Sequence, residues 1–113
     1  MDHKDSEVWK ESMDLAEMIF LIKGVSGYFA YRLQKAAISI PSDIADAFSR
    51  DSSRERIRAF EASTGQLAEL ETQYLLLVRF DENYKNSEFE NQIEKIKDLL
   101  SEAIREARND TKD

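Results

Sequence analysis

The stretch SSRERIRAFEASTGQLAELETQYLLLVRF, from Ser52 to Phe80, decides the fold of this chain. It has one glycine and no proline, and its apolar or small side chains recur at intervals of three and four residues, which places them on one side of an α-helix. Ser52 and Glu55 have the spacing of a capping box at its start. We therefore predict one helix over residues 53–80. Its inward stripe comprises Ile57, Phe60, Thr64, Leu67, Leu70, Tyr74 and Leu77.

The composition favours an all-α protein. The chain has 113 residues, 42% of them hydrophobic, with one proline and three glycines. A sheet protein would need turn residues about every ten positions, whereas so few breakers suit long helices. A helix over residues 53–80 is about 40 Å long, so other helices must lie beside it to bury its stripe. We predict a single domain over residues 1–113.

Three further helices are expected, at about residues 6–23, 28–49 and 87–108. Asp5 or Ser6 can cap the first, and glycines follow it at positions 24 and 27. Ser87 and Glu90 repeat the capping-box spacing before the last. Residues 109–113 should fray. The inward side chains predicted for these helices are Val8, Trp9, Leu15, Ala16, Ile19, Ile22, Phe29, Leu33, Ala36, Ala37, Ile40, Ile44, Phe48, Phe89, Ile93, Ile96, Leu100, Ala103, Ile104 and Ala107.

Pro41 lies inside the second predicted helix. Proline lacks a backbone donor and crowds the carbonyl four residues earlier, which here belongs to Ala37. We expect a kink or a short break between Ser39 and Pro41.

Short connections favour antiparallel neighbours, so we predict an up-down-up-down four-helix bundle. The runs at residues 18–22 and 74–78 are apolar on every side and meet at the same pole of such a bundle. One core cannot bury them completely, so we predict self-association there, while loops that cover them in a monomer are the alternative. The candidate interface residues are Met18, Phe20, Leu21, Tyr28, Tyr31, Leu75, Leu76 and Val78.

Two sequence blocks resemble a known family. The run LQKAAISIPSDIAD at residues 33–46 is similar to the hallmark of small proteins encoded by intervening sequences in bacterial 23S rRNA genes. Val8-Trp9 also fits the family. The chain also departs from the family at several positions. It has Asp43 where members usually have Asn, and Asp46-Ala47 where they usually have Glu-Gly. It has Gln34 where they usually have Arg, and Arg32 where Gln is common. The second block comprises Glu55, Ile57, Arg58, Gly65, Leu67, Glu69, Leu70, Glu71 and Thr72.

The resemblance implies an antiparallel four-helix bundle that assembles as a ring, commonly a homopentamer, with no established enzymatic activity. Related accessory proteins of diversity-generating retroelements are similar and act by binding a reverse transcriptase and nucleic acid. Under this reading the chain is an oligomeric scaffold, or a module that binds a protein partner.

The alternative is a nucleic-acid-binding accessory protein, suggested by the arginines at positions 50, 54, 56 and 58. The net charge of −7 opposes phosphate binding, and acids are interleaved with Arg50, Arg54, Arg56 and Arg58. A solvated salt-bridge face therefore also explains the cluster. Arg58 is the arginine that we expect to have a structural role.

No catalytic set, metal site or cofactor is predicted. The chain has no cysteine, and its one histidine, His3, lies in a terminus that we expect to be unordered. A di-metal carboxylate site in a helical bundle normally needs Glu-x-x-His pairs. Glu69 and Glu71 are the acids expected nearest to buried surface, where pairing with a base or serine across helices is favoured over chemistry.

The expected compartment is the cytoplasm. The chain lacks disulfides, and no apolar run reaches the eighteen or so residues of a membrane span. We expect a soluble protein that does not enter a membrane.

Overall fold

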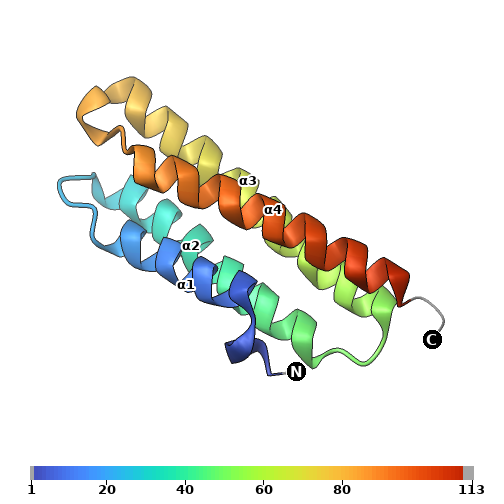
Figure 1. Ribbon diagram of the computed structural model, residues 1–113. Helices are drawn as coiled ribbons and strands as arrows, with labels where there is room; N and C mark the ends of the chain where they lie inside the picture. The colour runs from blue at the N-terminus through green and yellow to red at the C-terminus, as the bar shows by residue number, and fades with distance from the viewer. Residues whose placement is uncertain (1, 111–113) are drawn as a thin grey trace.

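A computed structural model describes residues 2–110 as an antiparallel four-helix bundle measuring 49 × 21 × 21 Å (Figure 1). Each helix packs against two neighbours: α1 and α3 both contact α2 and α4. The predicted all-α, up-down-up-down fold is confirmed. The elements are η1 (His3–Asp5), α1 (Glu7–Phe20), α2 (Gly27–Ser49), α3 (Ser53–Phe80), η2 (Glu82–Tyr84) and α4 (Ser87–Asn109).

The α3 helix runs the length of the bundle, as its pattern predicts. Ser52 caps it by accepting a hydrogen bond from the Glu55 amide at 3.2 Å. The inward stripe is confirmed except near the middle, where Ser63 is buried and Thr64 is exposed. Both hydroxyls donate to the carbonyl four residues earlier, so either can lie in a helix. Ile57 is half-buried.

The connection between α1 and α2 differs from the prediction. Ser6 caps α1, which ends at Phe20, three residues earlier than expected. Gly24 has φ +81°, a left-handed conformation that suits the chain reversal. Gly27, predicted to end the first helix, is instead the first residue of α2.

Gly24→Ala is expected to lower the free energy of unfolding by about 1 to 2 kcal/mol, because a side chain disfavours the left-handed conformation. The new Cβ would also lie 3.0 Å from the Tyr84 hydroxyl, which donates to the Lys23 carbonyl. Gly27→Ala is the matched control, since a Cβ there meets nothing within 4 Å. Urea denaturation of both variants checks this; equal midpoints would contradict it.

Pro41 does not break α2, which is continuous from Gly27 to Ser49. Pro41 is buried, and Ala37, Ile40 and Ile44 around it lie in the core. Tertiary packing therefore holds the helix together across the missing backbone hydrogen bond.

The start of α4 is capped by Asn86, whose side chain accepts from the Phe89 amide at 3.1 Å. The predicted Ser87–Glu90 capping box is wrong. Glu90 is drawn away because Lys85 Nζ and the buried Tyr74 hydroxyl both donate to it, each at 2.8 Å. This network ties the α3–α4 turn to the core.

The N-terminal residues are more ordered than expected. His3 lies in η1, and its ring contacts the Trp9 ring edge-on with centroids 5.2 Å apart. At the other end, α4 continues to Asn109, and residues 111–113 of the segment expected to fray lie outside the described residues. Within residues 2–110, no helix combines the length and apolar character that a membrane span requires.

Candidate interaction surfaces

The α1–α2 connection and the α3–α4 turn lie at the same end of the bundle, as predicted (Figure 1). We call this end the apolar pole. Six of the eight candidate interface residues expose between 44 and 76% of their surface; Met18 and Val78 are partly buried against the core. The exposed six are Phe20, Leu21, Tyr28, Tyr31, Leu75 and Leu76.

Three further exposed apolar side chains were not predicted: Met13, Ile38 and Phe80. Met13 lies seven residues before Phe20, and Ile38 seven residues after Tyr31. Two turns of helix separate the members of each pair, so each pair shares a face. This second apolar period was available in the sequence, but the runs at 18–22 and 74–78 obscured it.

A groove of about 230 Å³ follows the seam between α2 and α3 at the apolar pole. Arg32 crosses this seam and donates to Glu69 at 3.1 Å. The groove has apolar walls with two aromatic rings. It is lined by Tyr28, Phe29, Arg32, Gln73 and Leu76.

Glu69 and Glu71 both pair with bases on neighbouring helices. Glu69 pairs with Arg32 of α2, and Glu71 lies 2.9 Å from Lys97 Nζ of α4. The Glu71 carboxylate raises the pKa of Lys97 through that hydrogen bond. These contacts match the predicted structural role, in which the carboxylates join helices.

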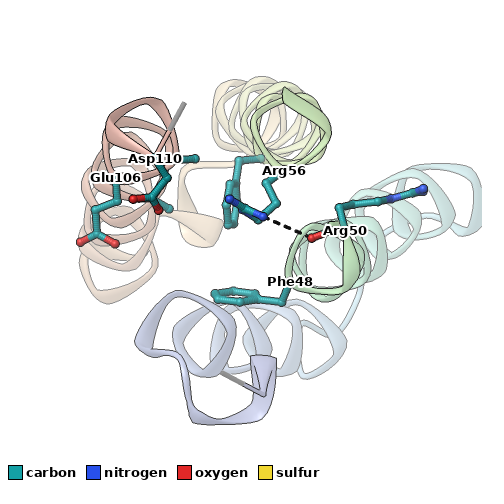
Figure 2. Close-up of a pocket in the computed structure, with 8 residues that line it drawn as sticks. Phe48, Arg50, Arg56, Glu106 and Asp110 are labelled. Carbon is teal, nitrogen blue, oxygen red and sulfur yellow. Dashed lines mark hydrogen bonds between the residues drawn. The ribbon is translucent and has the colours of Figure 1, made fainter. Parts of the chain in front are cut away.

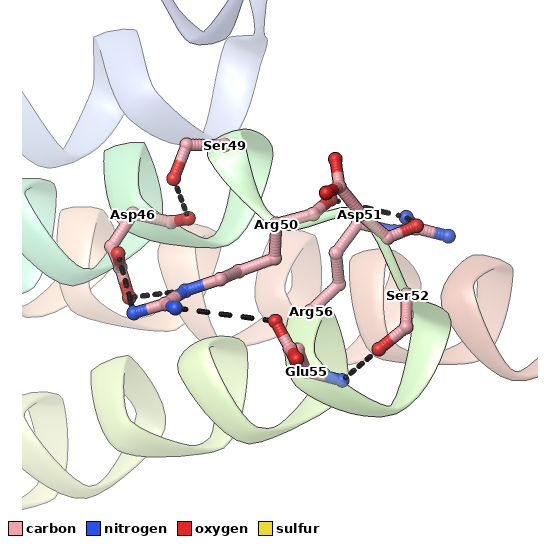
Figure 3. Close-up of polar contacts among 7 residues, drawn as sticks. All are labelled: Asp46, Ser49, Arg50, Asp51, Ser52, Glu55 and Arg56. Carbon is pink, nitrogen blue, oxygen red and sulfur yellow. Dashed lines mark hydrogen bonds and ion pairs between the residues drawn. The ribbon is translucent and has the colours of Figure 1, made fainter.

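The α2–α3 corner holds the predicted arginine cluster, and Figure 3 shows how its acids engage Arg50. The Arg50 guanidinium lies 3.0 Å from Asp46 and 3.9 Å from Glu55. Its charge is therefore neutralised within the corner, and the solvated salt-bridge reading holds for this residue.

Arg56 is the structural arginine of the corner, so the prediction for Arg58 is wrong. Arg56 donates to the carbonyls of Arg50 and Asp51 and to the Ser53 hydroxyl, the last at 2.9 Å. Figure 2 shows it reaching inward while the Arg50 side chain extends away. Arg58 is exposed because it lies nine residues, or 900°, before the buried Leu67, on the opposite side of α3.

A second groove, of about 280 Å³, lies between the end of η1 and the start of α1 on one side and the last half of α4 on the other, with Phe48 of α2 at its base. We call it the acidic groove. Its floor is apolar and its rim carries four carboxylates, of which Glu7 pairs with Lys95 at 4.0 Å. Lining residues are Asp5, Ser6, Glu7, Val8, Phe48, Leu99, Glu102, Ala103 and Glu106.

A metal site would need three or more acidic or histidine side chains close together. In the part of the chain that the structure describes, no three such side chains gather closely enough to hold one. His3 contacts Asp2 at 3.4 Å and the Trp9 ring.

The family model for the 23S rRNA-intervening sequence protein matches residues 4–105. No curated protein matches the chain. The match covers all four helices except the last turn of α4, including both blocks from which the resemblance was inferred. The chain therefore belongs to the 23S rRNA-intervening sequence protein family.

Proposed function

We propose that this protein is a non-enzymatic scaffold built from several copies of the same chain. The observation that carries the proposal is the amount of apolar surface left uncovered. Nine large hydrophobic side chains in the described residues are 44 to 79% exposed, and most lie at the apolar pole. A soluble subunit of this size rarely leaves so many together without a partner.

Burial of these side chains supplies enough free energy for stable association. A fully buried Leu or Phe contributes about 1.5 to 3 kcal/mol, so a few such residues per subunit offset the entropy lost on assembly. Tyr28 and Phe80 are 76 and 79% exposed, so a contact that covers them removes the largest fraction of side-chain surface from water.

The distribution of this surface supports a ring. Phe20 lies on α1 and Leu76 on α3, and these two helices are not neighbours but lie diagonally across the bundle of residues 2–110. A contact between the α1 side of one copy and the α3 side of the next is head-to-tail, and such contacts form a ring when the rotation between successive copies closes. Five copies is the number that the family resemblance implies.

The nucleic-acid alternative has less support. Arg50 and Arg56 are engaged within the protein, which leaves two of the four clustered guanidinium groups for phosphate. The net charge of −7 opposes that contact further.

Sedimentation or light scattering tests the proposal. The protein at micromolar concentration is expected to have a mass several times 13.1 kDa, five times for a pentamer. Leu76→Glu should shift the protein toward monomers, because it places a charge in the apolar contact. Ser101→Glu, at an exposed site on α4 away from the apolar pole, is the matched control and should keep the wild-type mass. A wild-type protein that is monomeric at tens of micromolar would overturn the scaffold proposal.

A further inference from the structure

We propose that Arg54 and Arg58 of one subunit dock on the acidic groove of a second copy of this chain. We call these two residues the arginine pair. This inference rests on the homo-oligomer proposed above. It assigns the two arginines that the α2–α3 corner does not use to the contact between subunits, which is then apolar at one pole and ionic at the other.

The arginine pair presents its charge outward. Arg54 and Arg58 are both exposed and lie one turn apart on α3. Neither forms an ion pair within residues 2–110, unlike Arg50 beside Asp46. Arg58 lies on the side of α3 opposite the buried Leu67, where it lines a shallow hollow beside Asp46 of α2 and remains exposed.

The acidic groove has the complementary chemistry. In the described part of the chain, no base lies within ion-pair distance of Asp5, Glu102 or Glu106, and Figure 2 shows the Glu106 carboxylate directed away from Arg56. The floor between these acids includes Val8 and Leu99. A guanidinium group suits this site, because its forked donors match carboxylates while its long stem covers apolar surface.

The two surfaces lie at the same height along the bundle. The Ser53 hydroxyl donates to the Asp110 carbonyl at 3.0 Å, which sets the start of α3 level with the end of α4. From that level, Arg58 lies about 7.5 Å along α3, while Glu106 and Glu102 lie about 6 and 12 Å along α4. The pair and the groove therefore occupy the same stretch of the bundle.

The two surfaces also face different sides. The groove lies between α1 and α4, whereas Arg58 lies at the seam between α2 and α3, on the other side of the bundle in residues 2–110. Two copies placed side by side, with their helices running in the same direction, can bring the pair of one against the groove of the next. This is a head-to-tail contact, consistent with the ring.

A charge swap tests the inference. Arg54→Glu with Arg58→Glu is expected to weaken association about tenfold or more, and Glu102→Arg with Glu106→Arg to do the same. All four changes together should restore association to within about threefold of wild type, because the charges are exchanged rather than lost. Sedimentation over a range of concentrations gives these constants, and the wild-type constant should fall as salt rises.

Arg105→Glu with Arg108→Glu is the matched control. It makes the same change of charge at two exposed arginines on α4 and should change association less than about threefold. Arg54→Gln with Arg58→Gln repeats the test without reversed charge and should also weaken association. Circular dichroism verifies that each variant keeps its helix content.

Three results would overturn the inference. One is a wild-type oligomer whose association constant is unchanged in the arginine pair variants, which would leave the scaffold proposal standing. A monomeric wild-type protein would instead disprove both proposals. Another is a fourfold variant as weak as its two halves combined. The third is a pair of results in the arginine pair variants: they lose binding to a labelled single-stranded RNA, while the mass of their oligomer stays that of wild type. This would assign the arginine pair to nucleic acid.

Discussion

Leu67→Ala is expected to lower the free energy of unfolding by about 2 to 5 kcal/mol, because it leaves a cavity in a close-packed core. Leu67 lies near the middle of α3, is 1% exposed and belongs to the core that all four helices share. Heat or urea denaturation followed by circular dichroism measures the change. Protein concentration must be held constant, since association adds to apparent stability.

Glu61→Ala is the control for that experiment. Glu61 is an exposed residue of the same helix, so its replacement should change the free energy of unfolding by less than about 0.5 kcal/mol. Equal melting curves for the two variants would mean that Leu67 does not face the core.

Tyr74→Phe is expected to lower the free energy of unfolding by about 1 to 3 kcal/mol. The Tyr74 hydroxyl accepts from the Asn86 amide and donates to Glu90, both at 2.8 Å, within a side chain that is 2% exposed. The phenyl ring keeps the packing against Phe89 but leaves the amide and the carboxylate without this partner. The same denaturation measurement checks the loss.

Tyr84→Phe removes a hydroxyl whose one hydrogen bond, to the Lys23 carbonyl, is exposed, and it should cost less than about 1 kcal/mol. A loss as large as that of Tyr74→Phe would contradict the assignment.

The effect of Tyr74→Phe should depend on pH. The Lys85 ammonium and the Tyr74 hydroxyl hold the pKa of Glu90 below its ordinary value of 4.5. The folded state therefore favours the ionised carboxylate, so this stabilisation is complete above about pH 4.5 and is lost as the pH falls through the lower folded value. The difference between wild type and Tyr74→Phe should shrink on acidification.

The helical architecture could be predicted because the buried positions are strictly periodic. Leu67, Leu70 and Tyr74 keep the three-and-four spacing, and few residues in the chain can interrupt a helix. The residue that caps each helix was harder to predict from the sequence. Asn86 and Ser87 can both cap a helix, and Asn86 prevails because Glu90, the partner that Ser87 would need, is bound by Tyr74 from another helix.

The candidate interaction surfaces were only partly predictable, for a related reason. A run of apolar residues indicates that some are exposed but does not identify which ones, and Met18 and Val78 pack partly into the core while Met13 and Ile38 do not. The acidic groove joins residues about 100 positions apart in sequence, so no local pattern could indicate it.

The uninterrupted α3 helix also fixes the distance between two surface sites at opposite ends of the subunit. It carries Arg58 near one end and Leu76 near the other, so the helix itself fixes the distance between them and the angle between them around its axis. Inserting one residue between them would turn one end by about 100° relative to the other, whereas seven residues would bring both back close to register. An insertion in α3 therefore keeps the direction of Arg58 relative to Leu76 around the helix axis only when it adds about two whole turns, and even then it moves the two residues about 10 Å farther apart.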